Sequence, residues 1–478
     1  MKTNINSWLS LHVGSNFFKK MGQLAVCLVL ATILTLTAAK FPFYNIKPFT
    51  HKPLNDVGEP LILTPLIEAN LTQKARELSK VPSNVFKDIE SYSGYFTVDK
   101  PNNGNLFFWF FPSARNYTED PVLLWLQGGP GVTSLYGLFA ENGPFVIQND
   151  TILLREYSWH KNYSVLYIDQ PIGTGYSFTN GPVVTNQTQV GEHLYSALYQ
   201  FFTVFSELQN NSFYVSGESY GGKYVPAISY TIHKKNPTSA LFINLQGIII
   251  GNGLSDPKYQ FKYGELLYQL GLIDQNALLE FQDIQNLIVN LIEEGRNDDA
   301  TFYWNQMVDI LFSEHTGLSN IYNYIMDFDY ISSDWETFVV QDSIREALHV
   351  GNQEFATESS EVYEGLYADI TRSVAPWISE LLSHYRVLIY NGHLDIIVGY
   401  VLTENYLQNL NFTGAEEYKT AERQIWKYSN QVAGYIKTAG NLTEALVRDA
   451  GHMVPTDQPE WAWDLLTKFI NNVSIANH

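Results

Sequence analysis

A Gly-x-Ser-x-Gly pentamer at Gly217–Gly221 constrains the fold of this chain more than any other segment. The preceding run, Ser212–Ser216, is rich in residues that favour strands, and Gly222–Ala227 suits the first turns of a helix. A serine between a strand and a helix is held on a sharp turn, where a Cβ at either glycine would crowd the backbone. The pattern therefore predicts that Ser219 is a nucleophile whose hydroxyl is exposed at the top of a sheet. The alternative is a glycine-rich turn with a surface serine.

Short, almost continuously apolar runs recur along the chain, as is typical of strands that helices cover on both faces. We expect buried strands at Leu106–Phe111, Val122–Leu126, Val165–Ile168, Phe213–Val215, Phe242–Leu245, Ile248–Ile250 and Val387–Tyr390. Apolar residues from Val190 to Phe205 have helical spacing, as expected of a crossover helix. These patterns together predict an α/β fold with a mostly parallel central sheet.

The segment from residue 255 to 374 has a different pattern, because it is helix-like, for example at Asn276–Glu294, and lacks buried-strand runs. We interpret it as a helical insertion that caps the carboxyl edge of the sheet and shapes a substrate cleft. The predicted plan is a leader at 1–39, a core in two parts at 40–254 and 375–478, and the insertion at 255–374. At the start of the core, Phe41–Lys80 is rich in turn signals and predicts an extended lead-in.

The overall charge restricts the classes of partner. The chain has 478 residues and a formal net charge of −20. This charge argues against nucleic acid or an anionic membrane surface as a partner. It also suits solubility in an acidic compartment, where carboxylates begin to protonate.

The first residues have the pattern of a secretory signal peptide. Lys19 and Lys20 precede an apolar run from Met21 to Thr37, and small residues follow it. This order predicts cleavage after Ala39, which leaves no membrane segment in the mature protein. The alternative is an uncleaved anchor, since the apolar run is near the length that spans a bilayer.

Glycosylation sequons and cysteine usage also indicate the secretory pathway, with an extracellular or lysosomal (vacuolar) destination. Nine Asn-x-Ser/Thr sequons follow the leader, at Asn70, Asn116, Asn149, Asn162, Asn186, Asn210, Asn411, Asn441 and Asn472. The single cysteine, Cys27, lies inside the leader, so the mature chain has no disulfide, catalytic thiol or cysteine-bound metal. We expect no metal or other cofactor.

A serine nucleophile needs a base and a carboxylate that orients the base, in the chain order serine, acid, histidine. His452 lies on a glycine-bearing loop after the strand-like run Thr443–Arg448. Asp395 follows the predicted strand Val387–Tyr390 and is placed to orient His452. For His452 the alternative is a surface loop histidine. His393 precedes the acid and is expected at the surface or in the cleft.

Backbone N–H groups that stabilise developing negative charge are the second requirement of this chemistry. Tyr220 follows the nucleophile and supplies one N–H group. Gln127–Gly131 follows an early strand and offers a glycine loop for the other, with Gly129 as the donor. The alternative for this loop is a plain turn.

These motifs together resemble the serine carboxypeptidases, an acid-active branch of the α/β-hydrolase fold. The likeness covers the chain after the leader and rests on Trp125–Gly131, Ile168–Gly175, Gly217–Pro226 and Ala450–Pro455. Gly58–Leu61 and Leu348–Gln353 look most similar to the vitellogenic-like subgroup. The resemblance implies removal of one amino acid from the free C-terminus of a peptide at acid pH, through an acyl-enzyme on Ser219. It places the acid on Asp395 and the base on His452.

The resemblance also implies a site for the terminal carboxylate of the substrate, formed by Gln127 and Glu218, with Glu141 as the partner of Glu218. Two carboxyls in mutual reach cannot easily both ionise, so one stays protonated and can donate a hydrogen bond. Gln127 departs from the family, because many members have asparagine there. The absence of disulfides is a second departure, and Val132 and Val398 stand where some members have cysteine.

Two other functions are compatible with the same motifs. Relatives of this scaffold act as acyltransferases or lyases with the same triad, and a non-catalytic luminal protein that binds peptides is the third alternative. The presence of Ser219, Asp395 and His452 together argues against the non-catalytic alternative. The sequence leaves open whether the protein is a monomer or a homodimer.

Overall fold

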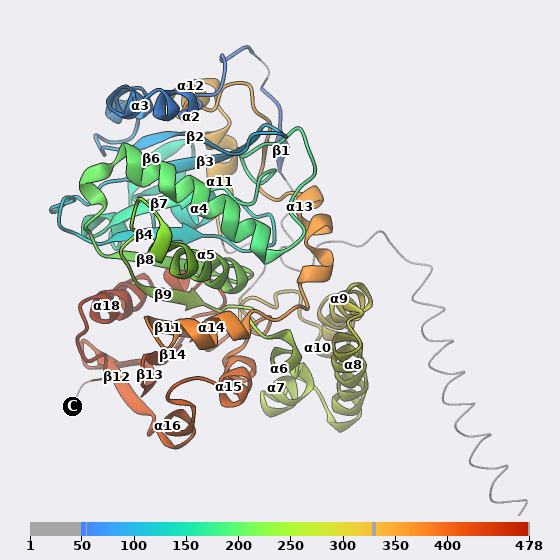
Figure 1. Cartoon of the computed structure of the whole chain (residues 1–478). Coiled ribbons are helices and arrows are strands. Elements are labelled where there is room, and N and C mark those ends of the chain that lie inside the picture. Colours follow the sequence, from blue (N-terminus) through green and yellow to red (C-terminus); the bar gives the residue numbers. More distant parts are fainter. Residues whose placement is uncertain (1–48, 54, 327–330, 477–478) are drawn as a thin grey trace, which may run out of the picture. The chain divides into compact units, whose positions relative to one another are not determined.

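The structure is a computed structural model that describes residues 49–53, 55–326 and 331–476. The main sheet has ten strands, all of which lie between residues 92 and 447 (Figure 1). In spatial order its strands are β12 (Gln424–Tyr428), β13 (Gln431–Ala439), β14 (Leu442–Val447), β11 (Arg386–Gly392), β9 (Leu245–Gly251), β8 (Phe213–Glu218), β4 (Val122–Leu126), β7 (Ser164–Ile168), β3 (Gly104–Phe111) and β2 (Tyr92–Asp99). The strands from β14 to β7 pair in parallel, and the two strands beyond each end pair antiparallel.

Helices cover both faces of this sheet, as the apolar runs predict. Consecutive residues of a strand point to opposite faces. On β8, the Phe213 ring packs edge-on against Phe202 of helix α4 (Gln187–Val204). The next residue, Tyr214, packs against Phe469 of helix α18 (Pro459–Ile470). The two helices therefore lie on opposite faces, which explains why the strand between them has no polar alternation.

The parallel register brings the carboxyl ends of six strands to one edge, those of β14, β11, β9, β8, β4 and β7. Leu126 of β4 pairs with Gly217 of β8, and Glu218 of β8 pairs with Gly251 of β9. On the other side, β9 pairs with β11, whose last residue, Gly392, pairs with Val447 of β14. The loops that follow these strands therefore start side by side, although they are far apart in the sequence.

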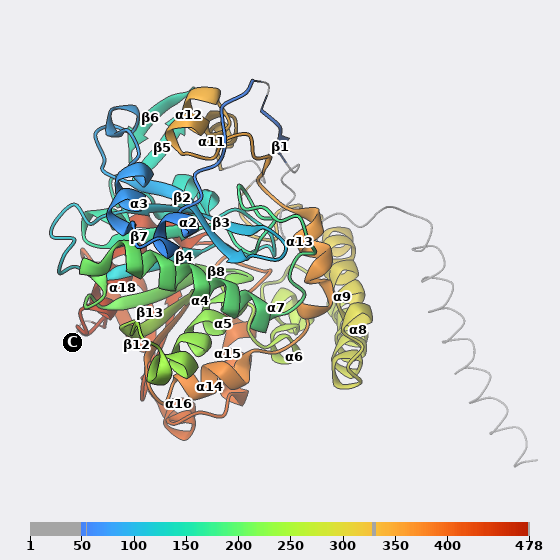
Figure 2. The ribbon, with the colours of Figure 1, turned by 45° about the horizontal axis from the view of Figure 1, so that its top comes forward.

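The predicted insertion region is mostly helical in the structure and contains one short strand, β10 (Phe355–Ala356). Its elements are α6 (Pro257–Gln260), α7 (Tyr263–Gln269), α8 (Gln275–Glu293), α9 (Asn297–Asn305), η6 (Gln306–Leu311), α10 (Phe312–Thr316), α11 (Asp334–Val339), α12 (Asp342–Ala347), α13 (Ser360–Gly365) and η8 (Tyr367–Asp369). Helices α8 and α9 lie side by side (Figure 2). The Asp274 carboxylate caps α8 by accepting from two N–H groups of its first turn, at 2.9 and 3.0 Å.

Shorter elements complete the fold. Helices are α2 (Thr64–Glu68), α3 (Thr72–Ser79), α5 (Gly221–Lys235), α14 (Ala375–Leu381), α15 (Tyr400–Asn409), α16 (Ala415–Thr420) and α17 (Val454–Asp457). Two small two-stranded sheets join β1 (Thr50–His51) to β10 (Phe355–Ala356) and β5 (Phe145–Gln148) to β6 (Thr151–Leu154). Short η-helices are η1 (Ser83–Val85), η2 (Gly137–Asn142), η3 (Trp159–Lys161), η4 (Ser206–Leu208) and η5 (Asn236–Thr238).

Two sequence-based expectations about local structure are wrong. The stretch Phe41–Lys80 was expected to be extended, but its described part contains α2 and α3, which pack on each other and on α4. The run Phe242–Leu245 was expected to be a buried strand, but β9 begins only at Leu245 and Phe242 is 60% exposed. An apolar run identifies a strand only where it pairs with neighbours, and Phe242 precedes the first pairing.

The predicted leader at 1–39 and its Cys27 lie outside the described residues. In the part of the chain that the structure describes, none of the helices combines the length and the apolar character needed to cross a membrane.

Candidate active site

Ser219 lies on the turn between β8 and α5, in the strained conformation that its flanking glycines permit. Its φ angle is 62°, in the left-handed region that non-glycine residues rarely adopt. Its N–H donates to the carbonyl of Gly251 at 3.0 Å, which ties the turn to the end of β9. A Cβ at Gly217 or Gly221 would lie 2.6 or 2.8 Å from the carbonyl oxygen of Leu126. The turn can therefore approach β4 this closely only with glycine at both positions.

The expected exposure of the Ser219 hydroxyl is wrong, because the side chain has no solvent-exposed surface. The glycine loop after β4 packs directly on the turn. A Cβ at Gly128 would lie 2.7 Å from the Cβ of Ser219 and 2.6 Å from the backbone nitrogen of Tyr220. Ser219 thus lies at the edge of the sheet but is enclosed by the glycine loop.

Asp395 and His452 form a buried pair at the same edge. The Oδ2 atom of Asp395 lies 2.8 Å from Nδ1 of His452, and both side chains are fully buried. A carboxylate at this position holds the proton on Nδ1 and leaves Nε2 free to accept another. His393 is exposed and takes no part in the pair.

Ser219 and His452 present unpaired atoms at this edge. The Oγ of Ser219 and the Nε2 of His452 are both buried, and neither has a hydrogen-bond partner among the described residues. In free enzymes the hydrogen bond between nucleophile and base is often long and tightens when substrate binds. Both atoms are therefore available to form a hydrogen bond with each other or with a bound molecule.

Two residues that sequence analysis missed orient this pair. The side-chain amide of Asn252, the residue after β9, donates to Asp395 Oδ2 at 2.6 Å. The carbonyl of Tyr322 accepts from the N–H of His452 at 2.7 Å, and its ring packs edge-on against the imidazole. The position of Asn252 directly after a strand of the parallel series was a usable signal. Tyr322 lies in the helical region, where no pattern marks it.

Gly129 and Tyr220, the expected oxyanion donors, lie in the glycine loop after β4 and directly before α5. Tyr220 is the residue that precedes α5, so its N–H lies outside the hydrogen bonds within the helix. Gly129 has a φ angle of 107°, and a Cβ there would lie 2.8 Å from the backbone nitrogens of Gly131 and Val132. This backbone conformation requires glycine.

The expected carboxylate-binding residues form a second buried group. Gln127 follows β4, and its amide donates to Glu218 Oε1 at 3.2 Å while its oxygen accepts from Trp125 Nε1 at 2.9 Å. Glu141 and Glu218 are at most 1% exposed. Burial and the charge of Glu141 raise the pKa of Glu218 well above its usual value, and burial raises that of Glu141. The pair therefore holds a proton at pH values where ordinary glutamates are ionised.

None of the sequons lies in the core. Asn162 and Asn186 are half-buried, and the others are exposed, namely Asn70, Asn116, Asn149, Asn210, Asn411, Asn441 and Asn472. Asn186 also caps α4 through its side-chain oxygen, which accepts from the N–H of Gln189 at 3.1 Å.

Comparison with known proteins identifies the same family as the motifs. The family model for serine carboxypeptidases matches residues 82–472. The chain is 49% identical to a venom serine carboxypeptidase of Apis mellifera, over 89% of this chain and 93% of that protein. It is 45% identical to the vitellogenic carboxypeptidase of Aedes aegypti, over 86% and 90%. It is 44% identical to the probable serine carboxypeptidase CPVL of Homo sapiens, over 87% and 91%.

The likeness to a solved structure confirms the expected fold class. The prohormone-processing carboxypeptidase Kex1(delta)p of Saccharomyces cerevisiae superposes with a TM-score of 0.73 at 24% identity, over 84% of this chain and 98% of that one. At this identity the comparison shows the α/β-hydrolase fold alone, and the family follows from the sequence matches. The expected likeness to vitellogenic-like relatives is also confirmed. The chain belongs to the serine carboxypeptidase family.

Proposed function

We propose that this chain removes single amino acids from the C-terminus of peptides at acid pH through an acyl-enzyme on Ser219. The observation that carries the proposal is the buried Asp395–His452 pair beside the strained Ser219 turn. In this mechanism Ser219 Oγ attacks the carbonyl carbon of the last peptide bond and His452 Nε2 takes its proton. The N–H groups of Gly129 and Tyr220 stabilise the oxyanion. His452 then passes the proton to the leaving amine, and water hydrolyses the ester.

The carboxyl pair explains why such an enzyme selects the end of a peptide. A protonated carboxyl on Glu218 or Glu141 donates a hydrogen bond to the terminal carboxylate of the substrate, and the Gln127 amide donates a second. An internal peptide bond offers no carboxylate at that place. The buried environment of both glutamates supports this role, because it keeps one of them protonated.

Hydrolysis of N-blocked dipeptides tests the proposal. The purified protein should release the C-terminal amino acid near pH 5, and it should not cleave the same dipeptide with an amidated C-terminus at a comparable rate. Release is measured by chromatography of the free amino acid. Equal cleavage of both substrates would contradict the carboxylate site, and no release from either would contradict the enzymatic proposal.

Raising the pH should weaken binding of substrates with a free carboxylate. Below its raised pKa, Glu218 is protonated and donates to the substrate, whereas above that pKa it is ionised and repels it. The KM for an N-blocked dipeptide should therefore increase as pH rises, while kcat changes less. Glu218→Gln keeps a donor at every pH, so its KM should stay nearly constant over the same range.

Glu444→Gln is the matched control for this experiment. Glu444 is also buried, and burial raises its pKa to about 7, but it lies in β14, three strands away from β8, and accepts a hydrogen bond from Tyr418. This variant should keep the KM profile of the wild type. If Glu218→Gln also kept that profile, another group would cause the pH dependence.

Buried carboxyls should also make the folded protein more stable in acid than at neutral pH. Burial raises the pKa of Glu358 to about 8, and neither of its oxygens has a partner in the described structure. Its stabilisation is complete below the unfolded pKa near 4.5 and is lost as pH rises through 8. The thermal midpoint should therefore fall by several degrees between pH 5 and pH 8. Glu358→Gln should reduce this fall, and Glu416→Gln, at an exposed position, should not.

The expected higher stability at pH 5 supports a function in the acidic lumen of a lysosome or vacuole. The proposed location is therefore the secretory pathway, with a lysosomal, vacuolar or extracellular destination. Exposed sequons support the same location. Equal thermal midpoints at pH 5 and pH 8 would contradict the expected profile. Treatment with a glycosidase and measurement of the mass would test whether the sequons carry glycans.

We also propose that the region 255–374 is an insertion that forms one wall of the substrate cleft. Its Tyr322 contacts His452, and the amide of its Asn323 donates to Asp457 at 3.0 Å, just after the His452 loop. A Cβ at Gly451 would lie 2.4 Å from the Tyr322 carbonyl oxygen, so this contact requires glycine beside the histidine.

A further inference from the structure

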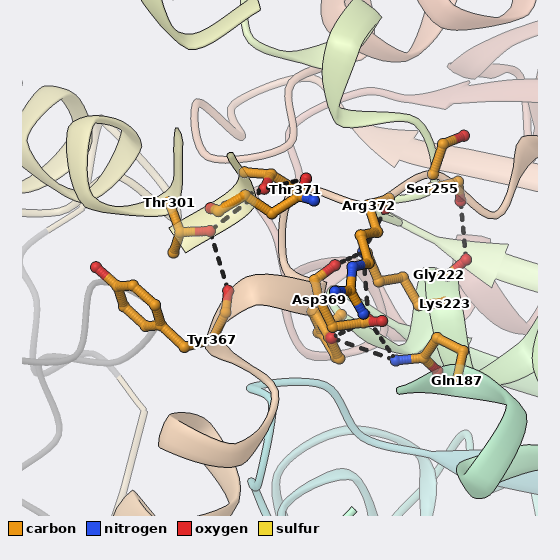
Figure 3. A network of polar contacts seen from close by, with 12 residues as sticks. Gln187, Gly222, Lys223, Ser255, Thr301, Tyr367, Asp369, Thr371 and Arg372 are labelled. Carbon is orange, nitrogen blue, oxygen red and sulfur yellow. Dashed lines mark hydrogen bonds and ion pairs between the residues drawn. The ribbon is translucent and has the colours of Figure 1, made fainter. Parts of the chain in front are cut away.

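A fully buried lysine lies four residues after the nucleophile, and the proposed chemistry does not use it. Lys223 and Asp369 are 0% and 3% exposed, and their Nζ and Oδ2 atoms lie 3.5 Å apart. The two residues belong to different parts of the chain, since Lys223 is in α5 and Asp369 ends η8 (Figure 3). With Tyr220 and Gln187 they form a group that we call the Lys223 cluster.

The ammonium group of Lys223 has three oxygen neighbours. Its Nζ donates to the carbonyl oxygen of Asp369 and to that of Arg372, the latter at 2.5 Å. The carboxylate of Asp369 is its third neighbour. A buried ammonium needs such compensation, because removal from water otherwise favours the neutral form. Lys223 therefore restrains the Asp369 carboxylate by binding two backbone carbonyls of the same segment, that of Asp369 itself and that of Arg372.

The carboxylate so oriented accepts two hydrogen bonds at Oδ2. The hydroxyl of Tyr220 donates at 2.6 Å and the amide of Gln187 donates at 2.8 Å. The Gln187 amide also lies 3.2 Å from the Tyr220 hydroxyl, so the three groups restrain one another. Tyr220 is completely buried, and its ring packs edge-on against Tyr224 at 5.1 Å. Both ends of the Tyr220 side chain are thus fixed.

The segment that carries Asp369 is itself tied to helix α9 by two hydrogen bonds (Figure 3). The hydroxyl of Thr301, in α9, donates to the Tyr367 carbonyl at 3.0 Å, and the hydroxyl of Thr371 donates to the Asn297 carbonyl at 3.1 Å. Ser255 links the end of this segment to α5, because its carbonyl accepts from the N–H of Val374 and its hydroxyl donates to the Gly222 carbonyl, both at 2.9 Å. The Asp369 segment therefore connects the helical region to the first turn of α5.

We propose that Asp369 is a positioning residue for the reaction, and that Lys223 and Gln187 hold it in place. Asp369 fixes the Tyr220 side chain, and this restrains the backbone N–H of Tyr220, which is one of the two proposed oxyanion donors. The inference rests on the proposed function, since it requires that N–H to act in catalysis. The geometry favours this role over a purely structural one because the hydrogen bond of Asp369 ends on the residue next to the nucleophile.

Tyr220→Phe tests the proposal with the smallest change. It removes only the hydroxyl that Asp369 holds and keeps the backbone N–H. The expected result is a fall in kcat of roughly ten- to a hundred-fold with KM within about two-fold of wild type, because a misplaced group costs transition-state contacts. A peptide aldehyde, which forms a tetrahedral adduct with Ser219, should bind more weakly by the same factor, whereas the free amino acid product should bind as before.

Tyr406→Phe is the matched control. Tyr406 is also a buried tyrosine, 1% exposed, and its hydroxyl has no hydrogen-bond partner in the described structure. This variant should retain wild-type kcat and aldehyde binding. Asp369→Asn is a second test variant and should lower kcat at least as far as Tyr220→Phe. Because it leaves Lys223 without its counter-ion, its thermal midpoint is measured alongside.

The outcomes separate this proposal from the proposed function. If wild type releases amino acids and Tyr220→Phe keeps kcat within two-fold of Tyr406→Phe, the positioning role is wrong and the function stands. A rise in KM with unchanged kcat and aldehyde binding would also overturn it, because it would mean a contact with the bound substrate. If wild type itself releases no more amino acid than Ser219→Ala, the proposed function is wrong, and the positioning role is wrong with it.

Discussion

Replacing Ser219 with alanine should abolish release of C-terminal amino acids, with a fall in kcat of roughly five orders of magnitude. Alanine has no oxygen to attack the substrate carbonyl, so no acyl-enzyme can form. The residual rate then comes from the oxyanion donors and substrate binding alone. The measurement is release of the terminal amino acid from an N-blocked dipeptide at pH 5, by wild type and variant at equal concentration.

Ser229→Ala is the control for this experiment. Ser229 lies in α5, the helix that follows Ser219. It is fully buried, and its hydroxyl has no hydrogen-bond partner among the described residues. Its loss should leave the rate near wild type. A serine-directed organophosphate should label wild type and Ser229→Ala but not Ser219→Ala. Equal rates for wild type and Ser219→Ala would refute the assignment of the nucleophile.

Replacing Asp395 with asparagine should lower kcat by roughly four orders of magnitude with little change in KM. Asparagine preserves the shape of the side chain, but its amide would donate to Nδ1 of His452 where the carboxylate accepts. The proton would then move to Nε2, which could no longer take the proton of Ser219. The contacts of Asp395 with Asn252 and with the N–H of Val398, at 2.6 and 3.2 Å, leave little room for another arrangement.

Asp449→Asn provides the comparison for Asp395→Asn. Asp449 follows β14 near His452 but is 59% exposed, so its loss should change kcat little. Both rates are measured at pH 5, with the thermal midpoint of each variant as a test of folding. A kcat for Asp395→Asn within ten-fold of wild type would contradict the role of Asp395 as the acid of the triad.

Local residue patterns were sufficient to predict much of the fold and of the candidate site. The apolar runs identified β3, β4, β7, β8 and β11, and helical spacing identified α4 and α8. Ser219, Asp395 and His452 were named because each follows a strand-like run, and parallel strands bring such positions to one edge. The two failures in secondary structure, at Phe242 and in the region of α2 and α3, occurred where apolar character or turn residues alone did not reveal the packing partner. The burial of Ser219 was missed because the glycine loop that covers it is far away in the sequence.

The sequence alone determined where strands precede Ser219, Asp395 and His452, because strand propensity is a local property. It also determined that the Ser219 turn has the glycines it needs, because the steric conflict of a Cβ there is short-range. Only the tertiary structure decided that Asn252 orients Asp395, that Tyr322 contacts His452, and that Lys223 and Asp369 meet. These contacts join residues at least 130 positions apart in the sequence. Their partners depend on how the loops at the carboxyl edge pack, and no local pattern encodes that packing.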